Sequence, residues 1–145
     1  MKLYPKILVT TDFSDQALAA VREAARVARE CESEVVLVHV IEDRVPPLLD
    51  PKTWAEVMKT HREQAKISLA RYAEEHLSGC RVGTEIGVGI PHRGVIDAAE
   101  RHEVDLIVIA SQGHSRLGHA LLGSTVDRVL RAAPCPVLVV RPDEE

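Results

Sequence analysis

The chain has 145 residues, 46% of them hydrophobic and 28% charged, with a formal net charge of −4. This length allows one hydrophobic core, the missing basic surplus argues against a nucleic-acid-binding protein, and no apolar run approaches the roughly 20 residues that span a bilayer. The N-terminal segment lacks the features of a secretory signal, and the three scattered cysteines, Cys31, Cys80 and Cys135, are typical of reduced thiols. We therefore expect a cytoplasmic protein with one domain over residues 1–145, binding neither nucleic acid nor membranes.

Five segments are predicted to form strands. Four are nearly continuous apolar runs, typical of parallel strands covered on both faces: residues 6–12, 34–40, 105–111 and 136–140. The fifth run, residues 82–88, alternates apolar residues with polar residues and glycine. We expect it to form a more exposed strand near an edge of the sheet.

Four helical patterns lie between these runs. Ser14 is a candidate N-cap for the first helix, and Asp50 followed by Pro51 marks the start of the second. The third begins near Pro91, and the fourth ends before Pro134, which cannot continue a helix. The second helix is expected to turn one face toward the core and to stop at Gly79; that face comprises Trp54, Met58, Ala65, Leu69 and Tyr72.

The strict alternation of strands and helices predicts an α/β fold. We expect a single open parallel five-stranded sheet with helices on both faces, as in Rossmann-like proteins. Residues 42–51, which include three prolines, form the longest irregular piece. We expect this piece to be a connection rather than a lid.

The glycine-rich segment ASQGHSRLGHALLGST, residues 110–125, links the fourth predicted strand to the last helix. Ligands of open parallel sheets bind beyond the carboxyl ends of the strands. Gly123, Ser124 and Thr125 open the last helix, where unpaired N–H groups, hydroxyl donors and a small residue favour an anion. The segment therefore predicts an anion site that needs no lysine; the alternative is a plain helix cap after a loop.

Asp12 ends the first predicted strand and faces this segment if strands one and four are neighbours. Beside phosphates, its carboxylate would accept hydrogen bonds from ribose hydroxyls or hold Mg²⁺. The alternative is that Asp12 caps a turn or the first helix. His114 and His119 face either phosphates or solvent, and His39, inside an apolar run, is interpreted as a buried, hydrogen-bonded histidine.

Several catalytic motifs are missing from the sequence. There is no P-loop, no G-x-G-x-x-G after the first strand, and no zinc motif, and GHSRLG misses the nucleophile elbow because Gly118 comes one residue late. No general base or arginine finger for fast phosphoryl transfer is evident. We therefore expect a protein that is not an enzyme or is at most a weak ATPase.

Four segments together resemble the universal stress protein family, over essentially the whole chain: KILVTTDFSDQA, VVLVHVIE, DLIVIASQGHSRLGHALLGSTVDRVL and APCPVLVVRP. This resemblance implies a fold like that of the adenine nucleotide alpha hydrolases. Family members that bind ATP carry G-x2-G-x9-G-[ST] after the fourth strand, and here the pattern reads Ala110-x2-Gly113-x9-Gly123-Ser124. The resemblance implies the following contacts: phosphates at Gly113, Gly123, Ser124 and Thr125, ribose at Asp12, and adenine at the backbone of Val40. Ala110 and His114 are further candidate residues of the same site. Thr10 stands where some nucleotide-binding members have proline.

Ala110 replaces the first glycine of that pattern. If the position needs a positive φ, alanine costs on the order of 1–2 kcal/mol. If φ is negative, the cost is one methyl group near the ligand. We expect binding to be retained because the rest of the pattern is intact.

The resemblance also implies a homodimer that pairs the last strands. Residues 136–140 fit this arrangement, because a long apolar strand at a sheet edge is a liability unless something covers it. We expect a dimeric stress-response protein that binds ATP, ADP or AMP with Mg²⁺ and acts in regulation. The alternatives are a nucleotide-independent interaction module and a slow ATP hydrolase or other nucleotide-dependent enzyme.

Overall fold

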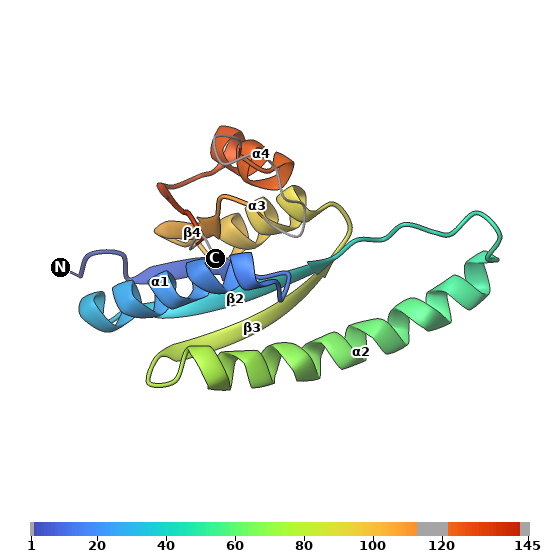
Figure 1. Ribbon diagram of the computed structural model, residues 1–145, viewed down its shortest axis with the longest axis horizontal. Coiled ribbons are helices and arrows are strands. Elements are labelled where there is room, and N and C mark those ends of the chain that lie inside the picture. The colour runs from blue at the N-terminus through green and yellow to red at the C-terminus, as the bar shows by residue number, and fades with distance from the viewer. Residues whose placement is uncertain (1, 113–121, 143–145) are drawn as a thin grey trace.

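Five parallel strands alternate with four helices in the computed structural model, which describes residues 2–112 and 122–142 (Figure 1). The strands are β1 (Lys6–Thr10), β2 (Glu34–Ile41), β3 (Arg81–Val88), β4 (Leu106–Ala110) and β5 (Val137–Val140). The helices are α1 (Asp15–Cys31), α2 (Pro51–His76), α3 (Pro91–Arg101) and α4 (Ser124–Ala132). Each predicted strand and helix is present.

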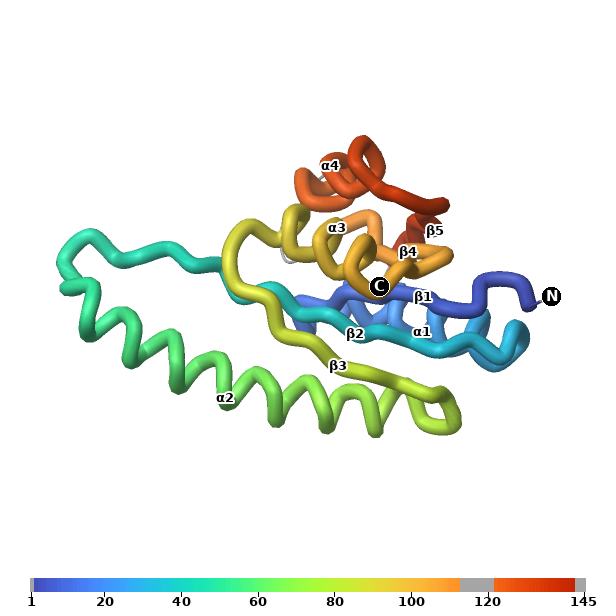
Figure 2. The backbone as a smooth tube through the Cα atoms, turned by 180° about the vertical axis from the view of Figure 1, so that it is seen from behind, coloured from blue at the N-terminus to red at the C-terminus, as the bar shows by residue number. Residues whose placement is uncertain are grey.

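The strands form one sheet in the order β3-β2-β1-β4-β5, and each neighbouring pair is parallel. The helices α1 and α2 cover one face of the sheet, and α3 and α4 cover the other (Figures 1 and 2). The chain runs outward from β1 to β3 and then crosses back to β4. The strand order therefore reverses between β1 and β4, and the predicted α/β fold class is confirmed.

Burial on both faces explains the continuous apolar runs. Along β1, Ile7 and Val9 pack toward α1 and α2, while Leu8 packs toward α3 and α4, and all three are fully buried. β3 lies at an edge, and Ile86 is its one buried residue. The alternating sequence of β3 therefore reflects its exposed position, as expected.

The predicted helix ends have clear local causes. The hydroxyl of Ser14 accepts a hydrogen bond from the Ala17 N–H at 3.1 Å and caps α1. The Asp50 carboxylate accepts one from the Thr53 N–H at 2.9 Å and caps α2. In the turn after α2, Gly79 has a φ of +83°, a conformation that glycine adopts without strain.

The long helix α2 is only partly attached to the sheet. Of its 26 residues, only Ala65 and Leu69 are buried. Its N-terminal half and residues 42–50 extend away from the rest of the molecule (Figures 1 and 2). None of the helices in the described part of the chain is long and apolar enough to cross a membrane.

Candidate functional site

A cavity of about 1100 Å³ opens at the carboxyl ends of β1, β2 and β4, where the strand order reverses. Both helix layers contribute to its walls, with Ala17 and Ala65 from α1 and α2, and Val95 and Val126 from α3 and α4. The predicted site residues that line it are Thr10, Asp12, Val40, Ala110, Gly123, Ser124 and Thr125. Two further predicted site residues, Gly113 and His114, lie outside the described residues. The structure thus brings together the predicted site residues that it describes.

The first turn of α4 lies in the wall of this cavity. Gly123 is the N-cap, and its N–H donates to the Ser111 carbonyl at 2.9 Å. The Asp127 N–H donates to the Gly123 carbonyl at 3.0 Å, so the three amides between them have no acceptor within the helix. No described side chain caps them. Such a turn presents N–H donors and a partial positive charge, which favour an anion.

Gly123 itself is not held in a special conformation. Its φ is −63°, so the positive φ that glycine permits is not used here. An added Cβ would lie 3.5 Å from the Ser111 carbonyl oxygen, which is an ordinary contact. The anion-binding character therefore comes from the uncapped amides and the neighbouring hydroxyls of Ser124 and Thr125.

Asp12 lies in the same cavity wall, just beyond β1. One of its oxygens, Oδ1, accepts a hydrogen bond from the Ser14 N–H at 3.0 Å and another from the Ser14 hydroxyl. The alternative role of Asp12, capping the turn before α1, is therefore present. A carboxylate has about four acceptor sites, so this turn fixes the group in the wall and is compatible with hydrogen bonds to a ligand.

Ala110 is free of backbone strain. It is not among the described non-glycine residues with positive φ. Its side chain, 8% exposed, belongs to the core between the sheet and α1 and α2, whereas α4 packs on the other face of the sheet. Of the two possibilities weighed from the sequence, the smaller cost applies, and that cost is one methyl group.

Phe13 was not predicted as part of the site. It has a φ of +65°, rare for a residue with a side chain, and its N–H donates to the Thr11 hydroxyl at 3.0 Å. Its ring centre lies 4.7 Å from that of His39 and 5.4 Å from that of Tyr72. Phe13 lines the cavity and is 37% exposed. The Thr11 hydroxyl is a local feature, but the rings of His39 and Tyr72 come from β2 and α2, so the local sequence alone does not signal this backbone conformation.

The interpretation of His39 as a buried, hydrogen-bonded histidine is confirmed in part. Its Nδ1 lies 2.8 Å from the Thr11 carbonyl oxygen, so the ring is hydrogen-bonded. It is half-buried rather than buried, however, because β2 ends at the cavity and His39 lines it. Behind it, burial raises the pKa of Tyr72 above its usual value of 10.0.

A second group that the sequence prediction missed comes from α2. His61, Gln64 and Ser68 line the cavity from the side opposite α3 and α4. Their spacing of three and four residues places them on one face of the helix. The signal available in the sequence was that polar residues interrupt the apolar face predicted for this helix.

The charges in the described lining are those of two carboxylates, Asp12 and Glu42, with no lysine or arginine. Glu42 is paired with the Arg44 guanidinium at 3.2 Å. An anionic ligand would therefore rely on main-chain amides and hydroxyls, and a cation would suit the carboxylate side. Within residues 2–112 and 122–142, no three histidine, cysteine or acidic side chains gather as metal ligands.

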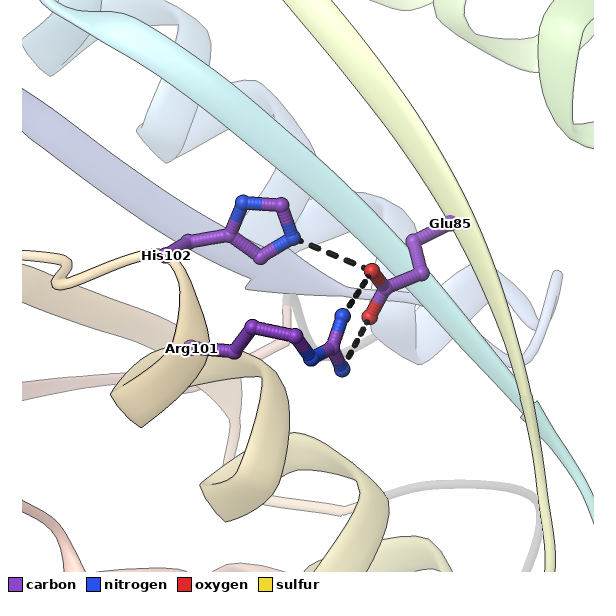
Figure 3. Close-up of polar contacts among 3 residues, drawn as sticks. All are labelled: Glu85, Arg101 and His102. Carbon is purple, nitrogen blue, oxygen red and sulfur yellow. Dashed lines mark hydrogen bonds and ion pairs between the residues drawn. The ribbon is translucent and has the colours of Figure 1, made fainter.

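One polar cluster lies outside the cavity and joins β3 to the end of α3 (Figure 3). Glu85 accepts hydrogen bonds from the two terminal guanidinium nitrogens of Arg101, Nη1 and Nη2, the second at 3.0 Å, and its other neighbour is the His102 Nε2 at 3.0 Å. Hydrogen bonding from Arg101 is the main cause that lowers the pKa of Glu85. The cluster fixes α3 against the edge strand, with the start of α3 at the cavity.

Comparison with known proteins finds one family over nearly the whole chain. The model of the universal stress protein family matches residues 3–141. The universal stress protein MJ0531 of Methanocaldococcus jannaschii is 35% identical, and the match covers 96% of this chain and 83% of that protein. The solved structure of protein MJ0577 superimposes with a TM-score of 0.86 and 34% identity, covering 98% of this chain and 99% of that one.

A more distant structure shares the fold. It is a universal stress protein in complex with cAMP, with a TM-score of 0.68 and 23% identity over 97% of this chain and 98% of that one.

Proposed function

The chain belongs to the universal stress protein family, and from this premise we propose that it binds an adenine nucleotide in the cavity between β1 and β4. The ligand is ATP with Mg²⁺, or ADP or AMP. The observation that carries the proposal is the first turn of α4, whose first three amides have no acceptor within the helix and which lines the same cavity as Asp12. The universal stress protein solved with cAMP supports an adenine nucleotide as the ligand class.

The proposal assigns the phosphates, the ribose and the adenine of the nucleotide to different elements of the cavity wall. The amides and hydroxyls at Ser124 and Thr125, with Gly123 and the undescribed Gly113 and His114, bind the phosphates. Asp12 accepts hydrogen bonds from the ribose hydroxyls, and the backbone of Val40 meets adenine beside Thr10 and Ala110. Because the described lining holds no lysine or arginine, the main chain supplies most of the attraction to phosphate.

Mg²⁺ fits this arrangement chemically. It prefers hard oxygen ligands and is usually held by one or two carboxylates together with substrate phosphates. Asp12 is the carboxylate that lines the described cavity wall together with the first turn of α4. Bound there, the ion would screen the repulsion between Asp12 and phosphate.

The protein acts by binding rather than by turnover. Fast phosphoryl transfer uses a base or water-positioning group and a cationic side chain near the phosphates. The described lining offers carboxylates but no cationic lysine or arginine. Occupancy of the cavity is therefore the proposed signal, and hydrolysis, if measured, should be slow.

Equilibrium dialysis with ATP and Mg²⁺ tests the proposal. We expect saturable binding that Ser124→Ala weakens by about tenfold, because a hydrogen bond to a charged group contributes about 1.5–3 kcal/mol. Ser78→Ala, which removes an exposed hydroxyl outside the cavity, is the control and should bind like the unaltered protein. Absence of binding at millimolar ATP would reject the proposal and favour a nucleotide-independent interaction module.

We also propose that the protein is a homodimer paired through residues 136–140. β5 is an edge strand, and its large apolar side chain Leu138 is 37% exposed. A two-fold symmetric partner would cover the edge and this side chain together.

A further inference from the structure

The cavity has a second side, formed by α2, that the proposed nucleotide contacts do not use. His61, Gln64, Ala65 and Ser68 follow the spacing of one helix face, and all four line the cavity. The proposed contacts lie at β1, β2, β4 and α4. These contacts leave the α2 face of the cavity without an assigned ligand group.

The composition of this α2 face is unusual for a helix that packs on a sheet. On either side of the cavity, the inward positions are large, with Met58 before it and Leu69 after it. Between them, the face carries two polar side chains around the small Ala65, namely His61 and Gln64. Positions where sequence and packing rules disagree are often functional.

These polar side chains have hydrogen-bonding capacity to spare. His61, Gln64 and Ser68 form no hydrogen bond with any of the described residues, and all three are exposed to the cavity and solvent. An amide and a hydroxyl both donate and accept, so they match neutral polar groups. They do not match a further phosphate, because the only charged side chains in the described lining are carboxylates.

Phe13 forms a wall of the same part of the cavity. Its ring stays 37% exposed although it packs against His39 in a tilted arrangement, and its backbone has the positive φ described above. Strained residues of this kind persist where the surroundings hold them, and they cluster at ligand sites. An exposed ring in a cavity wall is a surface on which a flat or ring-shaped group packs.

The size of the cavity agrees with a second subsite. Sites for single small ligands are typically about 300–1,000 Å³, whereas this cavity holds about 1100 Å³. Both helix layers contribute walls, so an occupant can contact both.

We propose that the space between Phe13 and the α2 face is a subsite for an uncharged, hydroxyl-bearing ring attached through phosphate to an adenine nucleotide. Phe13 packs against the ring, and Gln64 and Ser68 hydrogen-bond its hydroxyls or amide groups. The ring is either a sugar or a second nucleoside, since both carry this chemistry. This subsite rests on the proposed nucleotide function, because the phosphates anchor the ligand at α4.

Calorimetric titration with ADP, ADP-ribose and diadenosine triphosphate tests the subsite. At least one extended ligand should bind about tenfold more tightly than ADP, as two neutral hydrogen bonds allow. A gain with ADP-ribose identifies a sugar, and a gain with diadenosine triphosphate alone identifies a second nucleoside. Gln64→Ala should reduce the gain by about fivefold and leave ADP binding unchanged.

The control is Glu63→Ala, which alters an exposed neighbour on α2 that does not line the cavity; it should keep the whole gain. The subsite is contradicted if ADP binds but neither extended ligand binds more tightly. It is equally contradicted if Gln64→Ala weakens ADP and the extended ligand alike. If no ligand binds, ADP included, the nucleotide function and the subsite both fall.

Discussion

Gly94, in the first turn of α3, is a position where one methyl group decides how closely two elements approach. A Cβ there would lie 2.7 Å from Cγ2 of Val40 and 3.1 Å from its Cγ1. We expect Gly94→Ala to lower the free energy of unfolding by about 1–2 kcal/mol, because overpacking outweighs the helix preference of alanine. Nucleotide affinity should fall as well, since Val40 is the proposed adenine contact. Urea denaturation and equilibrium dialysis measure the two effects.

Gly83 provides the matched control for this substitution. It has no heavy atom within 4 Å of an added Cβ and lies in the exposed strand β3. Gly83→Ala should therefore not destabilise the protein and should leave nucleotide binding unchanged. A Gly94→Ala protein as stable as the Gly83→Ala protein would show that α3 and β2 are not in close contact.

At Ala110, removing a methyl group rather than adding one is expected to destabilise the protein. Because its backbone is unstrained and its methyl group is in the core, restoring the family glycine removes packing without relieving strain. We expect Ala110→Gly to lower the free energy of unfolding by about 1 kcal/mol. Nucleotide affinity should change by less than about twofold, because the methyl group makes no polar contact and lies away from the α4 turn that is proposed to bind the phosphates. An affinity gain of tenfold or more in dialysis would mean that alanine does obstruct the ligand.

At the level of secondary structure elements, the Glu85 cluster ties β3 to α3 and gives a pH-dependent contribution. The folded pKa of Glu85 is held below its usual 4.5, first by hydrogen bonding from Arg101 and then by His102. The stabilisation is therefore present above about pH 4.5 and is lost as the pH falls through the lower, folded pKa. Since Arg101 is 57% exposed and Glu85 23%, the pair contributes at most about 1 kcal/mol.

We therefore expect Glu85→Gln to cost less than about 1 kcal/mol at neutral pH. The difference from the unaltered protein should shrink as the pH falls below 4.5 and through the lower pKa of folded Glu85, where the carboxylate becomes protonated. Thermal unfolding at several pH values measures this, with Glu74→Gln on the exposed side of α2 as the control. A difference that stays constant down to about pH 3 would contradict an ionic origin.

The helix α2 shows what periodicity predicts and what it misses. The sequence indicated the face that turns inward, and its members Ala65 and Leu69 are buried while Trp54, Met58 and Tyr72 are half-buried. It did not indicate that the N-terminal half leaves the sheet, since the apolar spacing continues there. Periodicity reports which side of a helix packs, but the angle between helix and sheet depends on neighbours in other parts of the chain.

At the scale of the whole molecule, the edge strand β5 makes the proposed dimer testable. The carbonyls of Pro136 and Val140 accept hydrogen bonds from Ile107 and Ser111, so alternation turns the peptide groups of Val137 and Val139 toward the open edge. We expect Val139→Pro to give monomers in analytical ultracentrifugation, because proline removes the N–H that pairs with a partner. Circular dichroism should show a retained fold.

Val139→Thr is the control for this variant. Threonine keeps the backbone N–H and a similar shape, so it should remain dimeric. If Val139→Pro and the unaltered protein sediment alike, pairing through this edge is wrong.

The fold could be predicted from the sequence because each buried parallel strand appears there as a local run of apolar residues. It also indicated where the cavity would lie, on the condition that strands one and four are neighbours, because ligands gather where the strand order reverses. The structure meets that condition. The sequence prediction missed Phe13 and the α2 face for a physical reason. The conformation of Phe13 is supported by rings from β2 and α2 as well as by the nearby Thr11 hydroxyl, and His61 meets the cavity because of how α2 packs against β2 and β3.

The walls of the cavity come from residues as far apart in the chain as Thr10 and Val126. No short fragment therefore reproduces the site, and a bound ligand contacts both halves of the chain. Because unfolding must release the bound ligand, a ligand at one hundred times its dissociation constant raises the free energy of unfolding by about 2.7 kcal/mol. A simple dye-based melting curve, rising with each candidate compound, would thus screen a metabolite collection for whatever this protein carries in the cell.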